Sequence, residues 1–456
     1  MMLSTFLKKC LFLPVFRRRL NPAQALCLLI PLAFASLFRV AQAADAVPGE
    51  NYCAGPVDRI EFAGNKKTRD VVLLGQLVFR AGSECSLDDV VDGIQSIMDL
   101  GLFRSVAAAF DQKDGATVLT YSVKEKIYFL PIPRLSRTSD GELRYGAQLR
   151  WDNFSGLNHQ LKLTAEKRDE DDGAGPSGEH FELEYGIPRF FASDIGFSTE
   201  IVYQRKVREF EQDGIEFGLA QSNESGVKVQ LTRWLNRAGV TQGLRFRMGL
   251  RFSRRDQILI EGEAGPFVDG TDVAFNFGFD KRDVRDELFR LNGWAYGANV
   301  QLSSGFFGSS FDYVRGDIYY RRYKPLSGLK LRNLNYQLRV GISDSGSFGE
   351  RHFSLGGGEN HRSRQKRSKT GDILLLANIE YLVAWPGKQA LRGVVFGDIG
   401  NVYRREDFNP LHQKFGGGLG VRYKFLSFSN TDLRLDAAWD ASRQSFRYIF
   451  STSLTF

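Results

Sequence analysis

Two residue types that often mark an active site or a metal site are scarce in this chain. Its 456 residues include four cysteines and five histidines. The histidines are scattered along the sequence, at His159, His180, His352, His361 and His412. No spacing among them matches a metal-ligand set, and the chain contains no G-x-S-x-G, H-E-x-x-H or P-loop motif. The sequence therefore predicts no catalytic residue, no metal ion and no cofactor, and we do not expect an enzyme.

Long apolar runs are absent beyond the first 43 residues, so no transmembrane helix is expected there. Residues 1–43 begin with basic residues, continue with an apolar run over Leu26–Phe38 and end with small residues at Ala41 and Ala43. This order is typical of a cleaved secretory signal peptide. An uncleaved anchor helix is the alternative, but Arg39 interrupts the apolar run.

Removal of this segment greatly lowers the formal net charge of the chain. Residues 1–43 carry six Lys or Arg and no acidic residue, so the formal net charge falls from +8 to +2. The basic character of the whole chain is therefore not evidence for nucleic-acid binding. The mature chain keeps two cysteines, Cys53 and Cys85, and such a pair in an exported protein predicts a disulfide. Closing this loop would stabilise a small domain by about 3–4 kcal/mol in the chain-entropy model.

Residues 57–126 have the mixed periodicity of a small α/β domain, and residues 44–56 form a linker before it. An alternating strand comes first, two helical patterns follow, and two further strands end the segment. We expect Thr68 to cap the first helix and Ser86 to cap the second, because both hydroxyls directly precede a helical pattern.

From residue 127 to residue 456 the apolar residues recur with a period of two. About fifteen alternating segments of about ten residues are separated by Gly, Asn and Asp turns, and FLPIPRLSRT would be a sixteenth strand. Segments of this length can cross the hydrocarbon core of a bilayer. In one of them Arg245, Arg247 and Arg251 share a face, which could not line the dry core of a soluble sandwich.

The sequence thus predicts a mainly β protein with a 16-stranded antiparallel transmembrane β-barrel over residues 127–456, since a closed barrel satisfies every backbone group. The last segment has one apolar face and one polar face. We interpret its apolar side chains as a C-terminal assembly signal, formed by Tyr448, Phe450, Leu454 and Phe456.

The combination of a small α/β domain and a barrel resembles the bacterial surface antigen superfamily of outer-membrane assembly factors, the BamA/TamA-like proteins, whose small domain is called POTRA. The resemblance covers residues 57–456 and identifies the chain as a member with a single POTRA domain. In that domain it rests on IEFAGN, LGLFRSV and TVLTYSVKEK, and in the barrel on RWDNFSGLNHQ, FSLGGGENHRS, NIEYLV and VVFGDIGNVY. The segment FDKRDVRDELFRLNG resembles the D-x-R-D turn of the family, carried by Asp280, Arg282 and Asp283.

In that family a glycine-led loop folds back into the barrel, where its arginine meets acidic residues of the inner wall. The resemblance assigns the arginine to Arg362 and the acids to Glu380 and Asp398. A bidentate contact between arginine and carboxylate would hold such a loop in place. The glycines that let the backbone reverse are Gly356, Gly357 and Gly358.

The loop departs from the V-R-G-F/Y pattern of the family, because His361 precedes the arginine and Ser363 and Arg364 follow it. Because of this departure, the cations that follow are expected outside the barrel, near lipopolysaccharide phosphates, and they are Lys366, Arg367 and Lys369. A solvated basic loop is the alternative interpretation of the segment.

The resemblance implies a protein assembly or polypeptide translocation factor in the outer membrane of a Gram-negative bacterium, with the POTRA domain in the periplasm. Its expected partners are outer-membrane lipid and lipopolysaccharide, unfolded outer-membrane or exported polypeptides, and periplasmic accessory proteins. Pro131 and Pro133 predict a weak seam beside the first strand. The alternatives are a transporter of the two-partner secretion type and a passive pore or surface protein.

Overall fold

The computed structural model describes most of the chain from Pro56 to Ser451. The described residues are 56–137, 143–169, 178–189, 194–212, 215–239, 242–263, 268–287, 289–326, 331–348, 350, 352–358, 360–365, 367–429 and 432–451. The signal peptide expected over residues 1–43 and nearly all of the expected linker lie outside these ranges. Among the described residues, no helix is long and apolar enough to cross a membrane.

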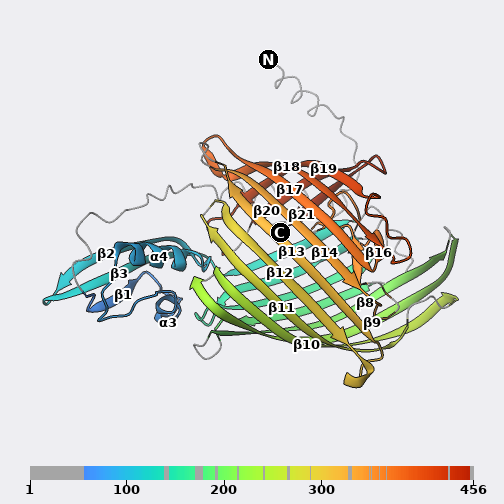
Figure 1. The fold of residues 1–456 in the computed structure, drawn as a ribbon, viewed down its shortest axis with the longest axis horizontal. Helices are drawn as coiled ribbons and strands as arrows, with labels where there is room; N and C mark the ends of the chain where they lie inside the picture. Colours follow the sequence, from blue (N-terminus) through green and yellow to red (C-terminus); the bar gives the residue numbers. More distant parts are fainter. Residues whose placement is uncertain are drawn as a thin grey trace, which may run out of the picture. The chain divides into compact units, whose positions relative to one another are not determined.

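The N-terminal part folds as the expected β-α-α-β-β unit, coloured blue in Figure 1. Its sheet has the order β1-β3-β2, in which β3 runs parallel to β1 and antiparallel to β2. The elements are β1 (Arg59–Ala63), α3 (Asp70–Leu74), α4 (Leu87–Met98), β2 (Phe103–Lys113) and β3 (Ala116–Glu125). Apolar side chains from both helices and all three strands form one buried core. Cys85 is buried in that core, whereas Cys53 lies outside the described residues, so the disulfide stays a prediction.

The two helices begin differently. Ser86 caps α4 as expected: its hydroxyl accepts from the backbone N–H of Asp89, whose carboxylate accepts from the N–H of Ser86. The prediction for Thr68 is wrong, because α3 begins one residue later, after Arg69, without a side-chain cap. The Thr68 hydroxyl donates instead to Glu125 at the end of β3, at 2.7 Å.

The remaining strands form one 16-stranded antiparallel sheet, which curves into a barrel (Figure 1). Each strand pairs with the next along the chain, except that β14 pairs with β17. The strands are β4 (Phe129–Arg137), β5 (Leu143–Phe154), β6 (His159–Asp169), β7 (Gly178–Ile187), β8 (Ile195–Gln212), β9 (Ile215–Gly239), β10 (Gln242–Gly262), β11 (Gly270–Asp286), β12 (Leu291–Ser303), β13 (Tyr313–Pro325), β14 (Arg332–Ser343), β17 (Ile373–Trp385), β18 (Lys388–Tyr403), β19 (Lys414–Lys424), β20 (Asp432–Asp440) and β21 (Ser445–Ser451). The mainly β fold class and the strand number are confirmed.

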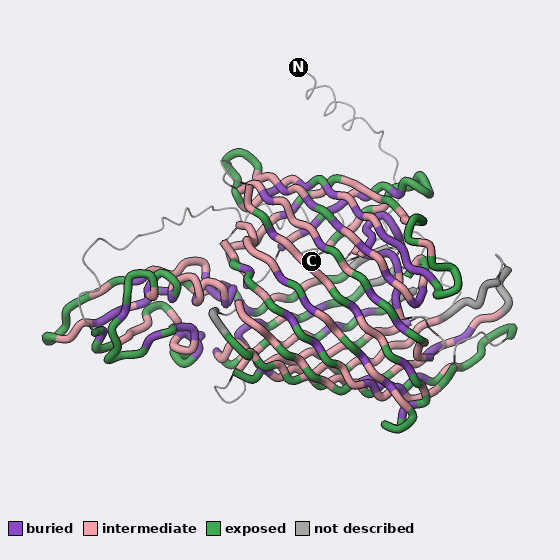
Figure 2. The backbone as a smooth tube through the Cα atoms, viewed as in Figure 1, coloured by how far each residue is buried: buried purple, intermediate pink, exposed green. Residues whose placement is uncertain are grey.

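The two faces of the sheet differ in the way the period of two predicts. Phe246, Met248 and Phe252 of β10 are 37–48% exposed on the outer face, whereas Arg251, between them in sequence, reaches an aspartate on the inside. Figure 2 shows the resulting alternation of exposed and buried residues along the strands. On β21, Tyr448 and Phe450 are exposed on the outer face. Leu454 and Phe456 of the expected assembly signal lie outside the described residues.

The strand directions give the barrel two distinct ends. The turn over residues 386–387 joins β17 to β18 at the end where β4 begins, which we call the proximal end. Longer connections join strands at the opposite, distal end, and the longest is residues 344–372, between β14 and β17. Within it β15 (Phe353–Leu355) and β16 (Lys369–Gly371) form a short antiparallel hairpin. The candidate functional site lies at the tip of this hairpin, in residues 356–368.

Candidate functional site in the barrel interior

The glycines at the start of the hairpin tip provide its reversal. Gly356 and Gly357 have φ angles of +103° and +108°, which side-chain-bearing residues rarely adopt. A Cβ on Gly356 would lie 1.8 Å from the carbonyl oxygen of Gln365, on the returning arm. The N–H of Gly357 donates to the carbonyl of Arg364 at 3.0 Å. Gly358 has no such constraint, so two of the three expected glycines are required for the turn.

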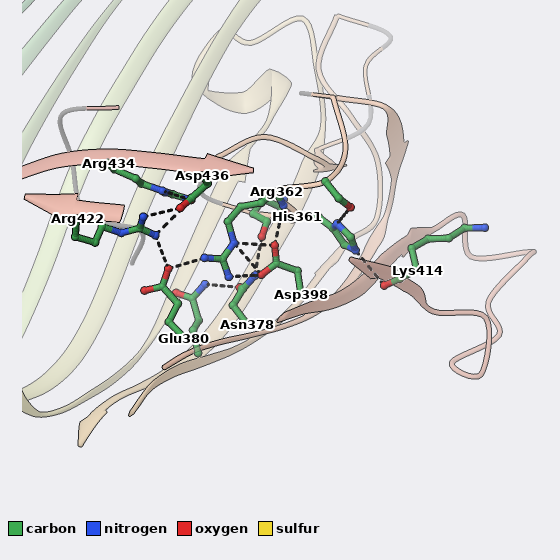
Figure 3. Close-up of polar contacts among 12 residues, drawn as sticks. His361, Arg362, Asn378, Glu380, Asp398, Lys414, Arg422, Arg434 and Asp436 are labelled. Carbon is green, nitrogen blue, oxygen red and sulfur yellow. Dashed lines mark hydrogen bonds and ion pairs between the residues drawn. The ribbon is translucent and has the colours of Figure 1, made fainter. Parts of the chain in front are cut away.

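Arg362 lies at the centre of the tip and is 0% exposed (Figure 3). Its backbone N–H and its Nε both donate to Oδ2 of Asp398 on β18, at 2.8 Å. Its Nη1 donates to Oε1 of Glu380 on β17, at 2.5 Å. The guanidinium carbon lies 3.8 Å from the centroid of the Phe396 ring. The structure therefore brings together the three residues that the resemblance selects, and it adds a stacking contact.

The network continues into two strands that sequence reasoning did not single out. Arg422 of β19 donates to Oε1 of Glu380 at 2.9 Å and to Asp436 of β20 at 2.5 Å. Arg434 donates to the other oxygen of Asp436 at 2.6 Å (Figure 3). Three arginines thus face three carboxylates, counting Arg362 and Asp398. Such a network compensates every buried charge, and removing one member leaves another unpaired.

An asparagine links the hairpin tip to the wall. Nδ2 of Asn378 on β17 donates to Oδ1 of Asp398 and to the carbonyl of Asn360, both at 2.7 Å. Its Oδ1 accepts from Gln337 of β14 at 3.2 Å. Asn378 therefore orients the carboxylate that receives Arg362 and also holds the backbone just before it.

The inner face of β19 has almost no side chains where the tip approaches. Gly416, Gly418 and Gly420 occupy alternate positions, so they share one face of the strand. A Cβ on Gly416 would lie 2.3 Å from Oγ of Ser363, and one on Gly420 would lie 2.0 Å from Oδ1 of Asp436. Glycine at these positions is what allows the tip and the ion-pair network to lie against this wall.

The residues that depart from the family pattern are part of the packed tip. His361, Ser363 and Arg364 are all buried. A ring nitrogen of His361 lies 3.0 Å from the carbonyl of Lys414, and Arg364 pairs with Asp440 at 3.1 Å. The interpretation of a solvated loop is therefore wrong for residues 361–364.

The cations after the tip have different surroundings. Arg367 is exposed and pairs with Glu350, and Nζ of Lys369 donates to the side chain of Asn401 at 3.2 Å. Lys366 lies outside the described residues. Whether these cations meet lipopolysaccharide stays a prediction.

The expected D-x-R-D turn is wrong as a turn, because Asp280, Arg282 and Asp283 lie within β11. Asp280 pairs with Arg245 of β10, and the chain reverses only after Asp286. Charged residues that look like turn formers here continue the period of two: Asp280 faces inward with 0% exposure, and its carboxylate receives Arg245 at 3.0 Å.

The inventory of groups limits the chemistry of the site. Among the described residues, no group of three or more His, Cys, Asp or Glu side chains is arranged to hold a metal ion. The acids of the hairpin site are engaged by arginines, so the arrangement can hold a loop in position.

Comparisons with known proteins give the family. The model of the Omp85 superfamily domain matches residues 153–456, and a surface antigen variable number repeat of the POTRA type matches residues 56–126. No curated protein sequence matches the chain.

Among solved structures, BamA from Haemophilus ducreyi lacking POTRA domains 1-3 is 15% identical, with a TM-score of 0.53 over 89% of this chain and 84% of that one. CdiB from Acinetobacter baumannii is 14% identical, with a TM-score of 0.59 over 87% of this chain and 73% of that one. CdiB from Escherichia coli is 13% identical, with a TM-score of 0.63 over 88% and 75%. At these low identities the three structures show a likeness of fold alone. The family itself is shown by the match of the Omp85 model to residues 153–456, which is more than half of the chain. With its single POTRA domain and its 16-stranded barrel, the chain belongs to the Omp85 superfamily.

Proposed function

We propose that the mature protein, residues 44–456, inserts or translocates polypeptides at the outer membrane of a Gram-negative bacterium. In this proposal the POTRA domain is periplasmic and receives unfolded clients, and the barrel admits them at a seam between β4 and β21. Membership in the Omp85 superfamily supports the general role. The observation that carries the seam is the pairing pattern of the sheet.

β4 and β21 are the two ends of the strand order, and no pairing between them exists among the described residues. On its other side β4 pairs with β5 without interruption from Phe129 to Arg137, although Pro131 and Pro133 lie within that stretch. Because alternate residues of an antiparallel strand direct their N–H groups to opposite neighbours, these prolines share one side. Because the ladder between β4 and β5 is intact, we infer that the two prolines lie on the other side of β4, which is the seam. At the seam β4 therefore offers fewer backbone N–H donors.

A strand edge with missing donors is a weak partner for β21 and a site where an incoming strand can add by backbone hydrogen bonds. The hairpin tip favours this route over a passive pore, since residues 361–364 are buried inside the barrel. Insertion at the seam requires β4 and β21 to separate, whereas a fixed pore does not.

Disulfide locking tests the seam. In a background without Cys53 and Cys85, Arg134→Cys on β4 would be combined in turn with single cysteines along β21, including Ser451→Cys, to find a pair that oxidises across the seam. The matched control, Ile132→Cys with Gln148→Cys, would join β4 to β5 at residues that already face each other. We expect the seam lock to abolish client assembly or export in cells that depend on this protein, and a reductant to restore it. Full activity of the oxidised seam lock, verified by mass spectrometry, would contradict the proposal.

A further inference from the structure

A second feature of the barrel interior lies beside the hairpin site. Gln337 connects the two, because it accepts from Arg321 and donates to Asn378. A cavity of about 270 Å³ opens between strands β10 to β14. It is lined by five arginines, which are Arg245, Arg247, Arg282, Arg321 and Arg339. Its volume is just below the range typical of pockets for drug-sized ligands, about 300–1,000 Å³. The cavity therefore suits a compact ligand.

The sequence of β12 explains why there is a hollow at this place. Its inward positions carry Ala295 and Gly297, opposite Arg321 and Tyr319 of β13. Ala295 lines the cavity with a short side chain, and longer arginine side chains of the neighbouring strands surround it. Gly297 is closely packed, since a Cβ there would lie 2.7 Å from Cβ of Asp280 and 3.0 Å from the Tyr319 ring.

The charges around the cavity do not balance. Asp280 receives Arg245 at 3.0 Å and Arg247 at 3.1 Å. Asp317 receives Arg339 at 3.2 Å. Five guanidinium groups therefore meet two carboxylates, in contrast to the hairpin site, where arginines and acids are equal in number. Three positive charges stay without a counter-charge among these contacts.

Two of the arginines are available to a ligand. Arg282 makes no ion pair with the described residues, and its Nε is buried without a hydrogen-bond partner among them. Arg321 donates to the neutral side chain of Gln337 at 2.7 Å and lies 5.0 Å from the centroid of the Tyr319 ring. The contacts of Arg321 with Gln337 and Tyr319 bring no negative charge to its guanidinium group. Arg282 and Arg321 therefore both keep N–H donors and a positive charge that an anion could use.

The location of the cavity restricts the source of the ligand. Arg245 lies near the start of β10, Arg282 near the end of β11 and Arg321 near the end of β13. All three positions are close to the proximal end of the barrel, and their side chains face the interior. A soluble ligand that enters the barrel from the proximal end therefore meets these side chains.

We propose that this cavity binds the phosphate group of a small soluble ligand, with Arg282 and Arg321 as its main contacts. Guanidinium groups bind tetrahedral oxyanions through paired N–H donors, and the binding is strongest where water is partly excluded. Arg247 and Arg339 keep the site positive while their own carboxylates hold them in position. This inference goes beyond the proposed function, because none of its observations concerns the seam between β4 and β21.

Calorimetric titration of the full chain in a non-ionic detergent tests the site. The probes are inorganic pyrophosphate and inorganic phosphate at a constant ionic strength of about 0.15 M, where non-specific attraction is screened. We expect saturable binding of one pyrophosphate per chain, weaker binding of phosphate and no competition by chloride. Glycerol phosphate, the headgroup fragment of a phospholipid, distinguishes the source of the ligand. If glycerol phosphate binds, the natural ligand is a phosphate ester. If it does not bind while pyrophosphate does, the natural ligand is a free inorganic anion.

Variants locate the binding. Arg282→Gln and Arg321→Gln should each weaken pyrophosphate binding at least tenfold, and because they lie on different strands, a folding defect in one leaves the other informative. The matched control is Arg285→Gln, three residues after Arg282 on β11 but exposed on the other face. Absence of saturable binding, equal competition by chloride, or equal weakening by the control would each overturn the proposal.

Discussion

At the scale of single residues, Arg362 combines three kinds of contact in one buried position. Its guanidinium group joins two carboxylates on different strands and stacks on Phe396, and its backbone N–H adds a further bond to Asp398. A lysine could not reproduce this arrangement, because an ammonium group lacks the planar fork that reaches both carboxylates and stacks on a ring.

Replacing Arg362 should destabilise the folded barrel. Arg362→Ala leaves the carboxylate of Asp398 buried without its cation, and breaking a buried pair in this way costs about 3–5 kcal/mol. On a semi-native gel, we expect Arg362→Ala to lose its folded band at a lower temperature than the natural protein. The temperature for Arg362→Lys should lie between those of Arg362→Ala and the natural protein. The control is Arg367→Ala, which removes an exposed pair with Glu350 and should have little effect. Equal behaviour of Arg362→Ala and the control would show that the contact does not hold the loop.

At the scale of elements, helix α4 depends on a reciprocal cap. The backbone and the hydroxyl of Ser86 both donate to Asp89, and these bonds hold the pKa of the Asp89 carboxyl below its usual value. Because the pKa is lower in the folded state, the stabilisation is present above the unfolded pKa of about 4. It is lost as the pH falls through the folded value.

Ser86→Ala should therefore weaken α4 by about 1 kcal/mol near neutral pH, which corresponds to roughly fivefold faster local opening. Amide hydrogen exchange of α4 in the full chain measures this. Ser96→Ala, in the same helix but away from its start, should not speed exchange, since alanine is the better helix former. The difference between the two variants should shrink below about pH 4, and a difference independent of pH would exclude the carboxylate's part in the cap.

The elements also show what sequence reasoning reached and what it missed. Alternation of apolar residues predicted the barrel strands, including β4 despite its prolines, because a period of two is a local property of the chain. The partners Arg422 and Asp436 were missed, since any inward charge of a barrel strand looks alike until the strand register is known. Asp280 and Arg282 were expected in a turn because their segment resembles a turn of the family, although their spacing fits a strand.

At the scale of the whole molecule, the hairpin formed by β15 and β16 folds back into the barrel interior. The hairpin packs Phe353 and Leu355 against Leu374, Leu376 and Val402 of the wall, and its tip joins the ion-pair network. An intact hairpin should keep the ion conductance of the barrel small.

Deleting residues 356–368 should raise the single-channel conductance in planar bilayers several-fold, because the tip no longer occupies the interior. A comparable shortening of the distal loop over residues 404–413 is the control, since that segment is largely exposed. If both deletions leave the conductance unchanged, the hairpin is not what limits the passage of ions.

The bare inner face of β19 has a consequence for how this region tolerates change. Gly416, Gly418 and Gly420 each face atoms that even a methyl group would strike, whereas Leu419 and Val421, between and beyond them, are exposed on the outside. Tolerance to substitution should thus rise and fall at every step along this strand. Natural variation of β19 should therefore be frequent on the outer face, which meets lipid. On the inner face, which meets the hairpin loop, only glycine should be accepted.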